Sequence, residues 1–351
     1  MKPILIDGLY LNCGGALTVL NRLLDGLAAE KVDYVLIKDA RCPQLTSENA
    51  AREIVIMPPS FKMRWQYYRH HKNDFQTILC MGNVPPPCKM NAKVHTYFHN
   101  LSLLVSNKGM NAQRKLKNEL KRLTISVLAR YTDSWIVQTS HTLNCLKSSL
   151  PTKGKSLYVM PIYSLPEGLE APSDLPREDY LFIGNYTHAK GHDELLAAWK
   201  LLHQRGFTKP LHLTVTGSDA FLAALDEAQK QGVPVVNHGF LPREEVVKLY
   251  HSSKAIVYPS YNESLGLGII EGLHAGCDVI ASDLPFAHAV CQPSEVFDPS
   301  SAESIAGAVE RYEEGGRKKS TLKIKDSIED LMSLIINHLP PQKSLCGTTR
   351  R

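Results

Sequence analysis

The chain has 351 residues, 43% of them hydrophobic and 21% charged, which is typical of a folded protein of about two domains. No apolar run approaches the roughly 18 to 20 residues that cross a bilayer, so a transmembrane helix is excluded. The apolar stretch at residues 3–6 is shorter than the about 7 to 15 residues of a secretory signal. The eight cysteines form no C-x-x-C pair. We therefore expect a cytoplasmic protein with reduced thiols.

Charge is divided unevenly along the chain. Residues 1–170 contain 22 Lys and Arg against 12 Asp and Glu, a net charge of +10. Residues 171–351 contain 18 and 23, a net charge of −5. A basic first half beside an acidic second half predicts a polyanionic surface or an anionic substrate for the first half alone.

Short apolar runs alternate with helical patterns through the first half. Strands are predicted at residues 3–6, 33–37, 53–57, 76–80, 94–98 and 134–138, and helices at 16–29 and 111–131. Strands that alternate with helices predict a parallel sheet in a doubly wound domain.

The helix predicted at 111–131 is both basic and amphipathic. Its cations are Arg114, Lys115, Lys117, Lys121 and Arg122. Its apolar stripe consists of Leu116, Leu120, Leu123 and Val127, and helical spacing leads us to expect that this stripe faces the core, with the cations on a solvated face. Residues 60–72 add four cations interleaved with aromatic rings, which favours contact with an anionic bilayer. No recognition motif accompanies the charge, so nucleic acid is not an expected partner.

Residues 164–178 are rich in proline and lack periodicity, which predicts an interdomain linker. Alternation then resumes. Strands are predicted at 180–184, 211–217, 233–239, 255–260 and 278–283, and helices at 190–204, 219–230, 243–252, 267–275, 301–314 and 323–339.

The pattern predicts an α/β protein of two doubly wound, Rossmann-like domains, at residues 1–163 and 179–322. Residues 323–351 hold a last helix, which can cross back to the first domain, and a frayed tail at 340–351. Ligands of such sheets bind beyond the carboxyl ends of the strands, at the point where strand order reverses. If the two domains face each other, the ligand cleft lies between them.

Residues 255–283 carry the most informative pattern. A strand is followed by a loop with Glu263, and Gly266 and Gly268 then begin a helix that carries Glu271. Glycines at a helix start let a phosphate approach the backbone, where free N–H groups and the helix dipole favour its charge. Glu271 lies one turn further along, where a carboxylate can bind ribose hydroxyls, and Glu263 can reach the hydroxyls of a sugar beyond the phosphates.

The spacing of these two residues in NESLGLGIIEGLHAGCDVIASD resembles the retaining glycosyltransferases of family four, which have the GT-B fold. The resemblance extends over residues 180–283, through YLFIGNYTHAKGHDELLAAWKLL, LHLTVTGSD and VVNHGFLPREEVVKLYHSSKAIVYPS. It implies a hexosyltransferase, in which a hexose passes from a nucleoside diphosphate sugar to a glycan or lipid-linked saccharide. In this family such an activity commonly builds bacterial surface polysaccharide, the O-antigen or capsule.

The resemblance also implies roles for single residues. The catalytic residues would be Glu263, His99 and Lys190. The donor-binding residues would be Gly14, Gly15, Gly184, Asn185, Lys190, Gly217, Phe240, Leu241, Ser264, Leu265, Gly266, Leu267 and Glu271. The family usually has arginine where this chain has Asn185, so Lys190 would carry more of the charge opposite the leaving diphosphate.

We expect neither a metal ion nor a cofactor, because the chain contains no D-x-D and no H-E-x-x-H motif. The expected partners are a nucleotide-sugar donor, a saccharide or lipid-linked acceptor and an anionic membrane surface, with the protein peripheral on the inner face of the plasma membrane. Two alternatives remain open: a sugar-nucleotide epimerase of the same fold, and a catalytically silent accessory subunit. The nucleobase, the sugar, the acceptor and the oligomeric state are open as well.

Overall fold

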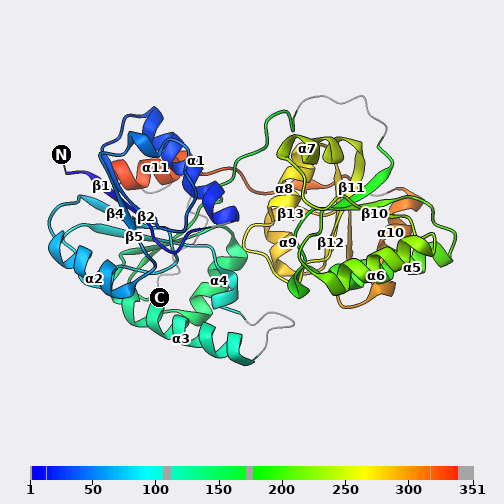
Figure 1. Ribbon diagram of the computed structural model, residues 1–351, viewed down its shortest axis with the longest axis horizontal. Helices are drawn as coiled ribbons and strands as arrows, with labels where there is room; N and C mark the ends of the chain where they lie inside the picture. Colours follow the sequence, from blue (N-terminus) through cyan, green and yellow to red (C-terminus); the bar gives the residue numbers. More distant parts are fainter. Residues whose placement is uncertain (1, 13, 106–111, 171–176, 317, 339–351) are drawn as a thin grey trace. The chain divides into compact units, whose positions relative to one another are not determined.

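The computed structural model describes residues 2–12, 14–105, 112–170, 177–316 and 318–338. These residues divide into two compact units (Figure 1). The first unit contains the described residues up to Ser164 and those from Lys325 onward, and the second contains those of Leu165–Ile324. Residues 171–176 of the predicted linker and the predicted tail at 340–351 lie outside the described residues.

The first unit is built on a parallel sheet which, within the described residues, has seven strands in the order β3-β2-β1-β4-β5-β6-β7. The strands are β1 (Ile4–Gly8), β2 (Tyr34–Asp39), β3 (Glu53–Met57), β4 (Thr77–Cys80), β5 (Lys93–Phe98), β6 (Ser134–Val137) and β7 (Ser156–Val159). Strands β1, β4 and β6 are buried at every position, as expected where helices cover both faces of a parallel sheet. Strand order reverses between β1 and β4, and this is the switch point of the unit.

Helices cover both faces of this sheet (Figure 1). On one face lie α1 (Gly15–Ala29) and α11 (Ile328–Asn337). On the other lie α2 (Phe61–His70), α3 (Ala112–Leu128) and α4 (Ser140–Ser149). Helices α1 and α11 share a leucine-rich core, made by Leu20, Leu23, Leu24, Leu27, Leu331, Leu334 and Ile335. The end of the described chain therefore completes the core of the first unit.

Helix α3 presents to solvent the face that its sequence pattern assigned to the core. Its buried residues are Ile125 and Leu128, near its carboxyl end. Asn118, on the same side, donates a hydrogen bond to the Ser102 carbonyl oxygen at 2.9 Å. The stripe on the opposite side is exposed, by 63% at Leu116, 59% at Leu120, 63% at Leu123 and 49% at Val127. The prediction that this stripe faces the core is wrong, because the helix touches its own unit along a different and partly polar side.

The second unit has, within the described residues, a six-stranded parallel sheet of order β10-β9-β8-β11-β12-β14. Its strands are β8 (Asp179–Phe182), β9 (Leu211–Leu213), β10 (Val235–Asn237), β11 (Ser253–Tyr258), β12 (Asp278–Ser282) and β14 (Glu295–Phe297). A separate antiparallel pair is formed by β13 (Cys291–Gln292) and β15 (Thr321–Leu322). The switch point lies between β8 and β11.

Helices again cover both faces of the sheet (Figure 1). On one side lie α5 (His192–Gln204), α6 (Asp219–Lys230) and α10 (Ala302–Glu314), and on the other α7 (Arg243–Ser252) and α8 (Leu267–His274). The short helix α9 (Pro285–Val290) follows β12. Strands β7 and β14 and helices α2, α4 and α9 carry no sequence prediction. Among the described helices none is long and apolar enough to cross a membrane.

Candidate active site

The candidate site of the second unit lies where strand order reverses. Lys190 follows β8 in a 3₁₀ turn (His188–Lys190), and Glu263 lies in the loop after β11. The Lys190 ammonium is 3.1 Å from Glu263 Oε1. The same oxygen accepts hydrogen bonds from the Tyr258 hydroxyl at 3.3 Å and the Ser260 hydroxyl at 3.1 Å. The two loops thus meet through a cation, a carboxylate and two hydroxyl groups.

Two glycines allow these loops to approach each other. A Cβ atom on Gly184 would lie 3.3 Å from Lys190 Nζ, so its absence leaves room for the lysine side chain. Gly191 has a φ of +69°, and a Cβ atom there would lie 2.4 Å from the Pro259 carbonyl oxygen. Glycine is required at position 191 both for its backbone conformation and for this close contact.

Asn185 follows Gly184 and supplies no charge. Its side-chain oxygen accepts a hydrogen bond from the Thr216 hydroxyl at 2.8 Å, which ties it to the loop that carries Gly217. Gly217 has a φ of +85° and open space where a side chain would lie. At this corner of the site, where family four usually has arginine, the chain presents an amide.

Helix α8 begins at this site. Its N-cap is Gly266, with a φ of +72°, and its first residue is the half-buried Leu267. The first N–H groups of a helix have no partner within it and attract anions. Leu265 is buried and anchors the turn beneath, while Ser264 is half-buried. A Cβ atom on Gly268 would lie 3.0 Å from the Tyr258 ring, so the absence of a side chain also lets the helix pack against this ring.

Glu271 lies one turn into α8, with 13% of its side chain exposed. It accepts hydrogen bonds from the Tyr250 hydroxyl at 2.9 Å and from Arg243 at 3.3 Å. Burial raises the pKa of Glu271, and the Tyr250 hydroxyl and the Arg243 charge oppose this by stabilising the carboxylate. Arg243 opens α7, directly after a loop that contains the half-buried Leu241 and the 86% exposed Phe240.

The candidate residues of the first unit lie at the carboxyl ends of its central strands. Gly14, with a φ of +70°, caps α1, and Gly15 is the first residue of that helix. Both are exposed. The turn after β1 is held by the Tyr10 N–H, which donates to Asp39 Oδ2 at 3.0 Å.

His99 follows β5 and is held by Asn83, which follows the neighbouring β4. The Asn83 side-chain oxygen accepts the backbone N–H groups of His99 at 2.8 Å and Asn100 at 2.9 Å. Its amide nitrogen is 3.3 Å from His99 Nε2. Since an amide nitrogen can only donate, Nε2 accepts and Nδ1 carries the proton.

The environment keeps the His99 ring neutral. Burial lowers its pKa to about 4. Nδ1 is buried and has no hydrogen-bond partner among the described residues. A neutral imidazole with a spare N–H group is therefore presented at this edge of the sheet.

The structure thus gathers most of the predicted residues into groups. Lys190, Glu263 and the start of α8 form one group. Glu271 is connected to the Phe240 loop through Arg243 and Tyr250 of α7. Gly14, Gly15 and His99 belong to the other unit. Sequence reasoning missed the side chains that hold the carboxylates and the histidine, which are Asn83, Tyr250, Tyr258 and Ser260. Only the position of Asn83, just after a predicted strand, could have indicated it.

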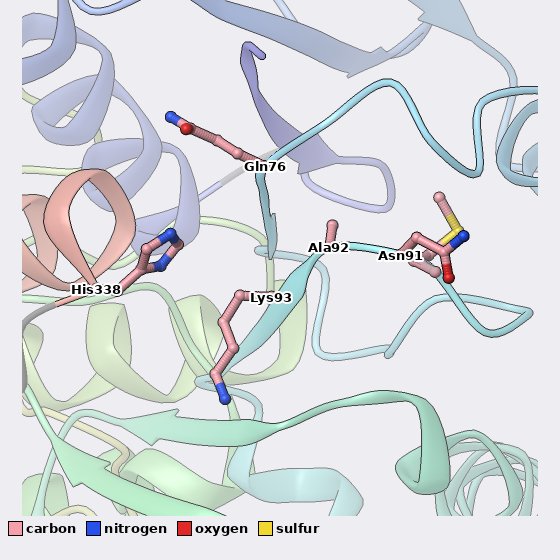
Figure 2. A pocket seen from close by; sticks show the side chains of 6 residues that line it. Gln76, Asn91, Ala92, Lys93 and His338 are labelled. Carbon is pink, nitrogen blue, oxygen red and sulfur yellow. The ribbon is translucent and has the colours of Figure 1, made fainter. Parts of the chain in front are cut away.

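A cavity of about 490 Å³ opens elsewhere in the first unit (Figure 2). It is lined by Gln76, Met90, Asn91, Ala92, Lys93 and His338. Gln76 and Lys93 lie at the amino ends of β4 and β5, whereas His99 and the glycine turn lie at the carboxyl ends of their strands. The cavity is therefore separate from the candidate residues. Among the described residues no cluster of His, Cys, Asp and Glu side chains is suited to hold a metal ion.

Comparison with known proteins finds a family model that matches residues of the second unit. Residues 170–327 match the family described as glycosyl transferases group 1. The chain is 29% identical, over 37% of its length, to the D-inositol 3-phosphate glycosyltransferase of Corynebacterium aurimucosum. It is 31% identical, again over 37% of its length, to the O-antigen chain mannosyltransferase B of Escherichia coli. These matches span 33% and 35% of the relatives, so the chain aligns with about a third of their length.

Solved structures show the same fold over nearly the whole chain. The sucrose-phosphate synthase of Thermosynechococcus elongatus superposes with a TM-score of 0.66, at 19% identity, over 90% of each chain. The lipopolysaccharide outer core galactosyltransferase WaaB superposes with a TM-score of 0.61, at 14% identity, over 95% of this chain and 94% of the other. The predicted fold class, GT-B with two doubly wound units, is confirmed.

Proposed function

We propose that the protein is a retaining hexosyltransferase, on the premise that residues 170–327 match the glycosyl transferases group 1 family. It transfers a hexose from a nucleoside diphosphate sugar to a saccharide or lipid-linked saccharide. The observation that carries this proposal is the Lys190–Glu263 pair at the switch point, next to the first turn of α8. This arrangement offers a cation and free N–H groups to a diphosphate and a carboxylate to a sugar.

Charge stabilisation is the main catalytic contribution in this proposal. When the bond between the sugar C1 and the diphosphate oxygen breaks, negative charge builds on the leaving group. Lys190 and the amino end of α8 lie on two loops that are hydrogen-bonded to each other, through Tyr261 N–H and the Ala189 carbonyl oxygen at 2.8 Å. Preorganised donors of this kind stabilise developing charge without rearranging first. The chain supplies this stabilisation although position 185 lacks the usual arginine.

The two carboxylates have different roles. Glu271, held by Tyr250 and Arg243, accepts the ribose hydroxyls of the donor. Glu263, held by Lys190 and two hydroxyls, accepts hydroxyls of the transferred hexose. Donor binding therefore places the diphosphate where Lys190 turns from Glu263 toward the phosphate oxygens.

The first unit supplies the acceptor side. Gly14 and Gly15 remain donor-binding residues in our proposal, and the neutral His99 is a catalytic residue. A saccharide carried on a lipid suits the net charge of +10 in residues 1–170, because a cationic surface is attracted to anionic lipid. Similarity to an O-antigen mannosyltransferase supports a role in surface polysaccharide synthesis, with the protein peripheral on the inner face of the membrane.

The test begins with binding. A panel of UDP-, GDP- and ADP-hexoses is screened by thermal unfolding, since a ligand at about a hundred times its dissociation constant adds about 2.7 kcal/mol of stability. The donor that binds is then incubated with saccharide acceptors, and the products are analysed by mass spectrometry and by NMR of the new anomeric centre. We expect a glycoside with the donor's anomeric configuration, formed equally well in excess EDTA.

The alternatives give different products. If the protein forms an isomerised nucleotide sugar in the absence of an acceptor, it is an epimerase and not a transferase. Binding without product, over a broad acceptor panel that includes lipid-linked saccharides, would favour an accessory subunit. Loss of activity in EDTA that Mg²⁺ or Mn²⁺ restores would contradict the proposed charge stabilisation by Lys190 and α8.

A further inference from the structure

Helix α3 carries an apolar surface that its own unit does not cover. With 3.6 residues per turn, Leu116, Leu120, Leu123 and Val127 form one straight stripe, and the buried Ile125 lies on the opposite side of the helix. Each side chain of the stripe is about half exposed or more. Monomeric soluble proteins rarely expose contiguous apolar patches without a binding purpose. The helix thus packs on its unit along a partly polar side and leaves its apolar stripe uncovered.

Cations border this stripe on both sides. Lys117 and Lys121 lie along one flank, and Lys115 and Arg122 along the other. The three lysines are exposed, and Arg122 forms an ion pair with Glu119. With Arg114, the helix carries five cations against one carboxylate. Long basic side chains beside an apolar stripe can keep their charged ends in water while their apolar stems lie along the apolar surface.

We propose that α3 docks on the surface of an anionic membrane, with the leucine stripe inserted among the lipid chains and the flanking cations on the headgroups. This inference builds on the proposed membrane location of the first unit and is independent of the transfer reaction. A helix of 17 residues, about 25 Å long, lies in the plane of the interface with its apolar face buried about 5–10 Å deep.

The charge distribution favours lipid over other occupants. A second copy of the chain that paired stripe to stripe would bring five cations against five. A nucleic acid would match the cations but would leave the leucines in water. Anionic lipid satisfies both features, since each cation near its surface contributes about 1 kcal/mol and the acyl chains accept the leucines.

The test separates insertion from charge attraction. Binding of the full chain to vesicles of phosphatidylglycerol and phosphatidylcholine is measured by sedimentation, without nucleotide sugar or acceptor. We expect binding to the anionic vesicles, none to pure phosphatidylcholine, and a decline as salt rises from about 0.1 to about 1 M and the Debye length falls from about 10 to about 3 Å. Leu116→Ser combined with Leu123→Ser should reduce vesicle affinity about a hundredfold, because two leucines leave the acyl layer while the charge stays unchanged.

Matched controls keep the result specific. Ile56→Ser removes another exposed apolar side chain of the same unit, 65% exposed on the edge strand β3, and should leave vesicle binding unchanged. Leu120→Trp serves as a reporter, whose emission should shift to the blue and be quenched by brominated lipid. Lys117→Glu combined with Lys121→Glu should weaken vesicle binding as well. Because the changed side chains are all exposed, every variant should keep the circular dichroism spectrum and the nucleotide affinity of the wild type.

Three results would overturn the proposal. Wild-type protein that stays in the supernatant at low salt excludes the membrane as partner. A leucine double variant that binds like the wild type excludes insertion. Concentration-dependent dimers that the leucine changes abolish, together with absent vesicle binding, would assign the stripe to a second copy. A failed transfer assay with intact vesicle binding would affect the proposed function alone.

Discussion

Glu263 and Glu271 stand eight positions apart in the sequence, and their surroundings differ in the way that two roles require. Glu263 is paired with the partly exposed Lys190 ammonium and with the hydroxyl groups of two buried residues, Tyr258 and Ser260. Glu271 is held by the fully buried Tyr250, which fixes its position within the unit. In the proposed reaction Lys190 turns from Glu263 to the leaving diphosphate, whereas the Tyr250 hydroxyl keeps the Glu271 carboxylate in place for the ribose.

This difference predicts separable effects of mutation. Glu271→Ala should weaken binding of the free nucleoside diphosphate about ten- to hundredfold, because hydrogen bonds to a charged group contribute roughly 1.5–3 kcal/mol. Glu263→Ala should leave that affinity nearly intact and lower turnover. Isothermal titration calorimetry and initial rates measure both effects, with Glu271→Gln as the variant that preserves shape around Tyr250. Equal loss of nucleotide affinity in the two alanine variants would contradict the division of roles.

Asn83 is predicted to act through His99. Asn83→Asp keeps the oxygen that accepts the two backbone N–H groups but replaces the amide donor to Nε2 with a negative charge. The pKa of His99 should therefore rise from its value of about 4, because a nearby carboxylate stabilises the imidazolium. NMR titration of the imidazole measures this shift. The variant should also lower turnover while nucleoside diphosphate affinity, a property of the other unit, stays constant. An unchanged His99 titration would rule out the contact as a determinant of the ring's charge.

At the scale of elements, the sequence predicts most of the helices and strands but not which way each one faces. Spacing shows that the four apolar residues of the stripe share one side of α3. Periodicity alone does not tell whether this side packs against the core of its own unit or against a partner. What decides the orientation is the chain around α3, where Ile125 packs in one cluster with residues of β5 and β6.

The candidate site shows the same division between local and distant information. Glu263, Glu271 and Gly266 were predictable because one continuous motif holds them. The hydroxyl that holds Glu271 comes from Tyr250, 21 residues away on another helix, and only the fold brings the two together. Asn83 and His99 lie 16 residues apart, just after two neighbouring strands whose pairing the sequence does not reveal. Residues that position a site are harder to predict than residues that occupy it.

The junction of the β8 and β11 loops is predicted to depend on Gly191. Gly191→Ala should destabilise the second unit by roughly 1–3 kcal/mol and lower turnover, because the new methyl group would meet the Pro259 carbonyl oxygen and push the Lys190 turn away. Gly206→Ala is the matched control, since its φ is also positive, at +85°, but nothing lies within 4 Å. Urea unfolding and steady-state kinetics compare the two. If both variants lose the same stability and keep full turnover, backbone strain alone accounts for the effect.

At the scale of the whole molecule, both units carry histidines that are kept neutral by burial. The pKa values of His95 and His99 in the first unit and His192 in the second are each lowered from 6.5 to about 4, chiefly by burial. In the unfolded chain these rings take up protons at a higher pH than in the folded state. Acid therefore favours the unfolded chain.

This predicts the direction of the pH dependence of stability. The contribution of the three histidines is fully present above pH 6.5 and is lost as pH falls toward about 4, by up to about 1.4 kcal/mol per pH unit for each ring. Urea unfolding at a series of pH values measures the slope. His192→Gln should flatten it for the second unit only, and His95→Gln for the first. Stability that stays constant from pH 6.5 to 4.5 would contradict the neutral state of these rings.

The return of α11 to the first unit has a consequence for how the protein is made. The ribosome completes residues 165–324 before it reaches α11, so the second unit can finish folding while the first still lacks a helix. Until α11 emerges, the leucines of α1 that it covers stay open to water or to a chaperone. Nascent chains arrested shortly before residue 325 should therefore hold a protease-resistant second unit beside a first unit that is still digested, and release of the full chain should protect both. Helix α11, which is synthesised after the second unit, completes the core of the first.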